Sequence, residues 1–197
     1  MTVCIDGEVS CIDFNTLAPQ AAHPKMFQVA RSDGRYGSVV REYANELGYQ
    51  AISVPGVLAG MDLALEKFGG ITMADALKPA IRACDKGFRM SANLITAVAD
   101  SEARMRQFPE TAKLFMEGDE LPKSGTRGSN PHLGKMLAEI AELGVREFYE
   151  GKIADRIVKH IEENGGILSK DDLASYQARL VDPIHSICME YDVYSPP

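Results

Sequence analysis

The stretch "SVPGVLAGMDLALEKFGGITMADALKPAIRACDKGFRMS", Ser53 to Ser91, decides the fold class of this 197-residue chain. Its first half carries apolar residues at the spacing of one helix face: Leu58, Met61, Leu65 and Phe68. The pair Gly69-Gly70 ends that helix. The second half repeats the pattern from Leu77 to Cys84 and stops at Gly87. The stretch therefore predicts two consecutive helices, the first of which begins near residue 57.

The two ends of the chain favour strands instead. Residues 2–14, "TVCIDGEVSCIDF", predict a β-hairpin around Asp6-Gly7, because glycine adopts the positive φ of a tight turn without strain. In the C-terminal stretch "PIHSICMEYDVYSPP", residues 183–197, apolar and polar residues alternate well enough to predict a strand or a hairpin. We therefore expect strands at about 1–15 and 184–195 and a helical region over about 57–177, which is an α+β fold. Isolated hairpins are marginal in water, so these should pair with each other or with strands that the chain does not contain.

Between these parts, residues 20–37 favour a loop. Residues 38–49, "SVVREYANELGY", place Val39, Val40, Tyr43 and Leu47 along one stripe and predict a short helix. A short strand is expected near residue 50. Ser169 and Asp172 have the spacing of a helix cap, so the neighbouring carboxylates Asp171 and Asp172 favour a capped helix start over a catalytic pair.

Composition excludes several classes of protein. The net charge of −7 argues against nucleic acid as a partner, and no apolar run is long enough for a membrane span. The four histidines and four cysteines lack metal-ligand spacing, and no phosphate-binding or nucleophile motif is present. We expect one domain over residues 1–197, with no metal, no cofactor and no catalytic residue visible from motif chemistry.

One short stretch, "CIDFNTLAP" from Cys11 to Pro19, suggests a binding site. A predicted strand ends there in two small polar residues, Asn15 and Thr16, just before a rigid Ala-Pro turn. Side chains at such a strand end often face a ligand, and short polar side chains also cap turns. Both interpretations of Asn15 and Thr16 stay open at this point.

Four stretches together resemble the gamma-glutamyltranspeptidase family of N-terminal nucleophile hydrolases. "CIDFNTLAP" is similar to the family strand that ends in Arg-Glu followed by x-Ala-Pro, and the opening stretch is similar to its Pro-Gly turn and the two helices after it. "REFYEGKIADRIVKHIEENGGILSKDDLASYQA" resembles the family's Phe-Tyr-x-Gly helix, Gly-Gly and Asp-Leu-x-x-Tyr segment. "YDVYSPP" resembles the strand before its Pro-Pro-x-Ser-x-Gly-Gly run. The four occur in the family's order and cover nearly the whole chain.

The resemblance implies an αββα sandwich made from a self-cleaving precursor. The new N-terminal Thr of the small subunit then acts as nucleophile, with its own amine as base, on gamma-glutamyl amides such as glutathione. This chain matches the middle and C-terminal part of the large subunit, so the resemblance implies a fragment without its nucleophile, inactive by itself. Asn15 stands where the family's Arg pairs with the substrate's alpha-carboxylate, and Thr16 stands at the neighbouring Glu position.

These resemblances predict part of a gamma-glutamyltransferase or amide hydrolase whose substrate-binding residues include Asn15 and Thr16. Two alternatives are the same fold acting on another acyl amide, as an acylase or amidohydrolase, and a non-catalytic helical binding module. The expected partners are a small-molecule amide and the missing small subunit with its catalytic Thr. Exposed strand edges also make a homodimer of the chain possible, because an unpaired edge is a template for another strand.

Overall fold

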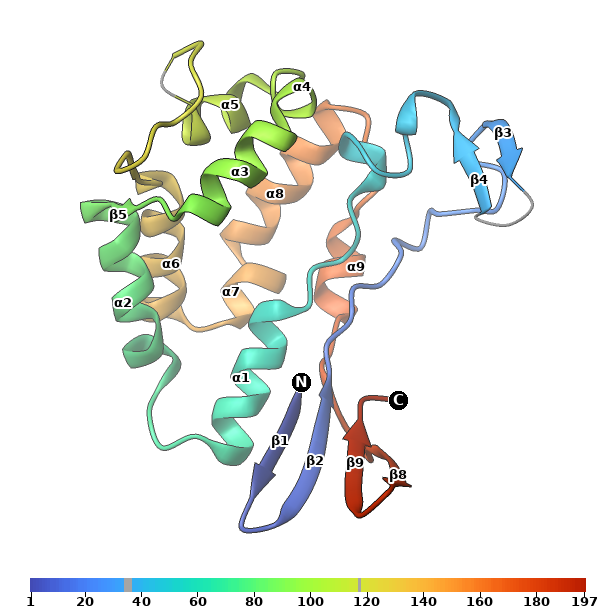
Figure 1. The fold of residues 1–197 in the computed structure, drawn as a ribbon, viewed down its shortest axis with the longest axis vertical. Helices are drawn as coiled ribbons and strands as arrows, with labels where there is room; N and C mark the ends of the chain where they lie inside the picture. The colour runs from blue at the N-terminus through green and yellow to red at the C-terminus, as the bar shows by residue number, and fades with distance from the viewer. Residues whose placement is uncertain (34–36, 117) are drawn as a thin grey trace. The chain divides into compact units, whose positions relative to one another are not determined.

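The computed structural model describes residues 1–33, 37–116 and 118–197 (Figure 1). Contacts within the chain divide it into two compact units. Unit 1 contains Met1–Met73 and Leu143–Pro197, and unit 2 contains Ala74–Glu142. Both termini and the whole Asn15–Thr16 region belong to unit 1.

The main sheet of unit 1 has three antiparallel strands in the order β1-β2-β7. They are β1 (Thr2–Ile5), β2 (Glu8–Asp13) and β7 (Arg179–Val181). The central strand β2 pairs Cys11 with Val181 and Asp13 with Arg179, so the two ends of the sequence meet in this sheet. Two hairpins complete the strands of unit 1: β3 (Val29–Asp33) with β4 (Gly37–Val40), and β8 (Ile184–Cys188) with β9 (Tyr191–Ser195).

The helices of unit 1 are α1 (Val57–Phe68), α7 (Arg146–Tyr149), α8 (Lys152–Glu163) and α9 (Lys170–Ser175). Helix α1 lies beside strand β2 (Figure 1). It approaches closely because Gly60 has no side chain: a Cβ atom there would overlap the ring of Phe14. Helices α7, α8 and α9 contact one another. The core holds the largest fully buried side chains of unit 1: Cys11, Ile12, Tyr149, Ile153, Leu168 and Leu173.

Unit 2 is mostly helical. Its helices are α2 (Met73–Lys86, whose first residue lies in unit 1), α3 (Ala92–Asp100), α4 (Glu102–Met105), α5 (Pro109–Phe115) and α6 (Pro131–Leu143, whose last residue lies in unit 1). The short strands β5 (Phe88–Arg89) and β6 (Arg127–Gly128) pair with each other. Arg127 donates to the carbonyls of Lys86 and Gly87 and so caps the end of α2.

The α+β fold with terminal strands is confirmed, but the segment 38–49 was predicted wrongly. It forms strand β4 and then two 3-10 turns, η1 (Arg41–Tyr43) and η2 (Tyr49–Ala51), instead of a helix. Glu42 and Tyr43 have φ values of 57° and 54°, which no regular right-handed helix contains. The strand near residue 50 is reduced to one bridge between Leu17 and Val54. The expectation of a single domain stays a prediction.

Candidate functional site

The candidate site lies where strand β2 ends in the loop Asn15–Gln20. The side chains of Asn15 and Thr16 are both exposed. The turn itself is capped by Asp13, whose Oδ1 accepts a hydrogen bond of 3.2 Å from the Asn15 backbone N–H. The side-chain cap recorded at this turn therefore comes from the residue before the predicted pair. The side chains of Asn15 and Thr16 are left facing solvent.

A pocket of about 310 Å³ opens beside this loop. Within the described part of the chain its lining residues are Asp13, Asn15, Leu17, Ser175, Tyr176, Gln177 and Arg179. The lining includes Asn15 but not Thr16, so the structure separates the two residues that the sequence grouped. A smaller pocket of about 110 Å³ also includes Asn15, together with the C-terminal residues Pro196 and Pro197. Asn15 thus lines both pockets.

The charged groups of the larger pocket are Asp13 and Arg179, which face each other across strands β2 and β7. Arg179 donates to Oδ2 of Asp13 at 2.7 Å, and the Arg179 side chain is 70% exposed. The hydrogen bond from Arg179, helped by the Asn15 backbone N–H, lowers the pKa of Asp13. The guanidinium uses one of its nitrogens for Asp13 in this pair, and the largely exposed side chain also lines the pocket. The pocket therefore presents an ion pair and an amide to a polar ligand.

The last residue of helix α9, Ser175, and the two residues that follow it line the pocket. The helix begins at a capping box, in which Ser169 Oγ accepts from the Asp172 N–H while the Asp172 carboxylate accepts from the Ser169 N–H. The predicted cap is thus confirmed. Although burial opposes ionisation, hydrogen bonds from Ser169 and from the Gln20 backbone lower the pKa of Asp172. Asp172 is therefore a buried, ionised structural carboxylate.

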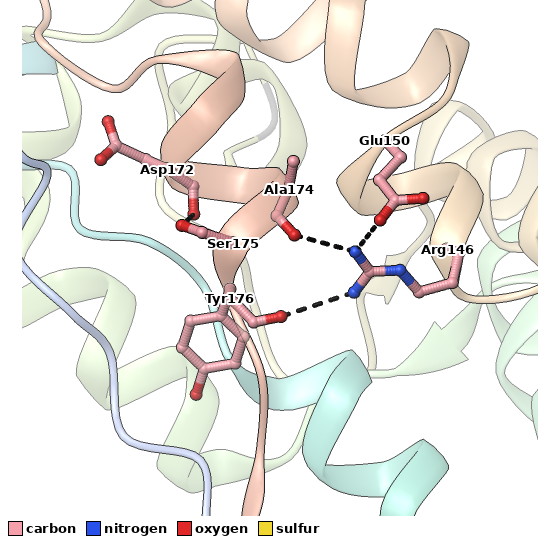
Figure 2. A network of polar contacts seen from close by, with 6 residues as sticks. All are labelled: Arg146, Glu150, Asp172, Ala174, Ser175 and Tyr176. Atoms are coloured by element: carbon pink, nitrogen blue, oxygen red, sulfur yellow. Dashed lines mark hydrogen bonds and ion pairs between the residues drawn. The ribbon is translucent and has the colours of Figure 1, made fainter.

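The C-terminal end of α9 is held by Arg146 of helix α7 (Figure 2). The Arg146 guanidinium donates to the carbonyl oxygens of Ala174, at 2.9 Å, and Tyr176, at 3.4 Å, and it also pairs with Glu150. These contacts satisfy carbonyls that a helix end leaves without partners.

Burial, with a smaller contribution from the Asp13 carboxylate, raises the pKa of Tyr176, so its hydroxyl stays a donor.

In the described part of the chain, the hydroxyl groups that line the pocket are engaged in hydrogen bonds. Its lining hydroxyl groups belong to Ser175 and Tyr176, and each donates to a backbone carbonyl, of Asp172 and Asn15 respectively. The lining residues include no histidine or lysine that could act as a base for a nucleophile. No group of three or more metal-binding side chains occurs among residues 1–33, 37–116 and 118–197. The geometry therefore supports ligand recognition.

Sequence reasoning missed Tyr176, Arg179 and Arg146 as parts of this region. Tyr176 and Arg179 come just after a capped helix. The cap predicts where the helix begins, but it does not predict that these residues contact Asn15 and pair with Asp13. Arg146 lies 30 positions before Tyr176 in the sequence, so no local pattern links the two residues. The sequence pointed to Asn15, Thr16 and the Ser169–Asp172 cap, but to none of these three. In the described part of the chain, no helix has the length and apolar character that a membrane crossing needs.

Comparison with known proteins gives one family. The family model described as "Gamma-glutamyltranspeptidase" matches residues 1–197. The glutathione hydrolase proenzyme of Escherichia coli (strain K12) is 32% identical over 98% of this chain and 32% of its own length. The acylase ACY 1 proenzyme of Pseudomonas sp. (strain SE83) is 29% identical over 98% of this chain and 34% of its own length.

Among solved structures, the gamma-glutamyltranspeptidase of Helicobacter pylori is similar to this chain with a TM-score of 0.88 and 30% identity. The similarity covers 100% of this chain and 55% of that one. The curated relatives described above are longer than this chain, which spans about a third of their length.

Proposed function

Because the chain belongs to the gamma-glutamyltranspeptidase family, we propose that it is large-subunit sequence of an enzyme that cleaves or transfers acyl amides. Gamma-glutamyl amides of the glutathione type are the first candidate substrates. The observation that carries this proposal is the position of Asn15. The end of β2 presents an exposed amide to a pocket that Arg179 also lines.

In this proposal the chain binds the acyl group and a Thr nucleophile comes from sequence outside it. The Thr hydroxyl attacks the amide carbonyl, the amine leaves, and water or another amine then takes the acyl group. Pro196 and Pro197 line the smaller pocket together with Asn15, so residues that follow Pro197 in a longer protein would start beside the acyl pocket. The small subunit with this Thr is the proposed protein partner.

The acyl group is read by Asn15 and Arg179, with Thr16 at the rim. An arginine fork makes two charge-assisted hydrogen bonds to a carboxylate, whereas Asn15 offers a neutral amide. Arg179, on strand β7, lines the same pocket as that amide. An acyl carboxylate can therefore contact both side chains, and gamma-glutamyl substrates fit this arrangement in spite of the Asn at position 15.

A second candidate is an acylase that acts on other acyl amides. The acylase ACY 1 relatives of two Pseudomonas strains favour it, as does the neutral side chain at position 15. The third possibility is a helical binding module without chemistry, which would lack a downstream Thr. The sequence that follows Pro197 in the gene distinguishes the module from the two enzymes.

The experiment is a charge substitution in the full-length protein. Asn15→Arg should raise kcat/KM for a gamma-glutamyl anilide by about tenfold or more, because a second guanidinium meets the acyl carboxylate. A neutral acyl anilide should gain nothing. Asn93→Arg, an exposed substitution on α3, is the matched control and should change neither substrate. An unchanged ratio between the two substrates would show that Asn15 does not read the acyl group.

Two further expectations belong to the same proposal. The purified 197-residue chain should show no amidase or transpeptidase turnover, because covalent catalysis needs a nucleophile and a base that the proposal places elsewhere. Turnover that scales with the concentration of this chain would contradict it. The chain by itself is also expected to form homodimers through exposed strand edges, and analytical ultracentrifugation tests this.

A further inference from the structure

We propose that Asp172 and Tyr176, at the two ends of helix α9, are positioning residues that hold the loop Asn15–Gln20 in place for substrate recognition. The inference rests on the proposed function, in which Asn15 lines the acyl pocket. It assigns a role to two residues that lie more than 150 positions away from the loop in the sequence.

Asp172 fixes the C-terminal end of the loop. Its side chain is buried, with 4% exposed. One carboxylate oxygen, Oδ2, serves the helix cap by accepting from the Ser169 N–H at 2.9 Å and the Ser169 hydroxyl at 2.7 Å. The other oxygen, Oδ1, accepts from the Gln20 backbone N–H at 2.8 Å. A helix cap does not need this second contact, which is charge-assisted and therefore strong.

Tyr176 fixes the N-terminal end of the loop. Its hydroxyl donates to the Asn15 carbonyl oxygen at 2.8 Å, and the residue is 2% exposed. The ring stacks on Tyr149 with a centroid distance of 5.8 Å and an angle of 10°. The Tyr149 hydroxyl donates to the carbonyl of Pro55 at 2.9 Å, which fixes that ring in turn.

The Tyr176 hydroxyl packs tightly against Gly56. A Cβ atom at Gly56 would overlap this hydroxyl and the carbonyl oxygen of Phe14. Arg146 holds the backbone of the same tyrosine by its contact with the carbonyl oxygen (Figure 2). The hydroxyl packs in this tight space and donates to the Asn15 carbonyl.

Both anchors use backbone atoms of the loop. The Asn15 carbonyl and the Gln20 N–H are engaged, while the side chains of Asn15 and Thr16 are exposed. This division is what a recognition loop requires: a fixed backbone and free side chains, so that a ligand does not have to order the loop when it binds.

The test for Tyr176 uses full-length protein and two matched hydroxyl deletions. Tyr176→Phe keeps the stacked ring and removes the bond to Asn15. Tyr49→Phe removes a comparable hydroxyl contact, with His160 at 3.0 Å, away from the loop. For whichever acyl anilide the wild type turns over, Tyr176→Phe should raise KM about two- to tenfold, as the loss of one hydrogen bond predicts, with kcat changed less than twofold. Tyr49→Phe should leave both constants unchanged. Equal KM values for the two variants would overturn the proposal.

The test for Asp172 uses amide hydrogen exchange, measured by NMR on the chain Met1–Pro197. Asp172→Asn removes the charged acceptor of the Gln20 N–H, whereas Ser169→Ala removes cap contacts and leaves that acceptor in place. The Gln20 amide should exchange about tenfold faster in Asp172→Asn than in Ser169→Ala. Equal exchange rates would overturn the role of Asp172. If the full-length wild type turns over no acyl amide, the proposed function fails, and so does the proposed role of this loop in substrate recognition. The exchange rates still decide whether α9 holds the loop.

Discussion

Helix α9 and the hairpin β8–β9 are separated in the sequence only by strand β7, yet one has side chains buried in the core and the other is exposed. In α9, Leu173 is 0% exposed, and both helix ends are capped by side chains. In the hairpin every residue is exposed, including Ile187 at 73% and Tyr191 at 73%. Within the described ranges, the hairpin pairs with no further strand.

The difference distinguishes a helix that this chain packs into its own core from a hairpin that its own core leaves exposed. The hairpin is held locally, by a contact of 2.7 Å between His185 and Asp192 and by stacking of His185 on Tyr194. An exposed apolar hairpin of two strands gains little stability in water. Large exposed apolar groups mark an interaction surface, whereas the buried face of α9 contributes directly to folding.

The largest expected effect comes from truncating the two regions in the same way. Leu173→Ala should lower the free energy of unfolding by about 2–5 kcal/mol, because it leaves a cavity in the core. Ile187→Ala should change it by less than about 0.5 kcal/mol, since its side chain is already in water. Urea unfolding of both variants measures this. A loss of several kcal/mol from Ile187→Ala would mean that the hairpin packs against the core.

The next effect depends on pH. Asp172→Asn should destabilise the chain by about 1–3 kcal/mol at pH 7, because buried donors lose a charged acceptor. The folded pKa of Asp172 lies below its ordinary value of 3.8. Its contribution to stability is therefore present above pH 3.8 and is lost as the pH falls through the folded pKa. Unfolding at pH 7 and pH 3 should show the gap between variant and wild type shrinking at pH 3, and a constant gap contradicts the ionised state.

A smaller effect is expected at the other end of α9. Arg146→Gln removes the guanidinium that contacts the carbonyls of Ala174 and Tyr176, and should lower stability by about 1 kcal/mol. Lys159→Gln is the control, because its ion pair with Glu163 is long, at 3.9 Å, and exposed. Thermal unfolding compares the two, and equal melting temperatures would show that Arg146 does not support α9.

The smallest effect on folding should accompany a clear effect on association. Ile187→Lys is expected to change the free energy of unfolding by less than about 0.5 kcal/mol, yet to weaken self-association of the chain, because it places a charge on the exposed hairpin. Val57→Lys, at a residue that is 57% exposed outside the hairpin, is the control. Sedimentation across a range of concentrations reports association, and equal behaviour of both variants would remove the hairpin from the interface.

The candidate site was predictable only in part. Asn15 was proposed because a polar residue at a strand end is a local pattern, and its role stays a prediction. The Ser169–Asp172 cap was predictable because it spans three positions. Tyr176 and Arg179 were not found, because their importance comes from facing Asn15 and Asp13 across the pairing of β2 with β7. The segment 38–49 was predicted wrongly because an apolar stripe fits a helix and, in this case, a strand followed by turns with positive φ.

The sequence by itself determined the helical middle of the chain, its terminal strands and its family, since helix periodicity, glycine stops and caps act between neighbours in the chain. The tertiary structure alone decided that α9 contacts the loop Asn15–Gln20 and that Arg179 shares a pocket with Asn15. These contacts join residues about 150 to 166 positions apart. They depend on which strands pair and which helix ends meet them, and no local spacing encodes that choice.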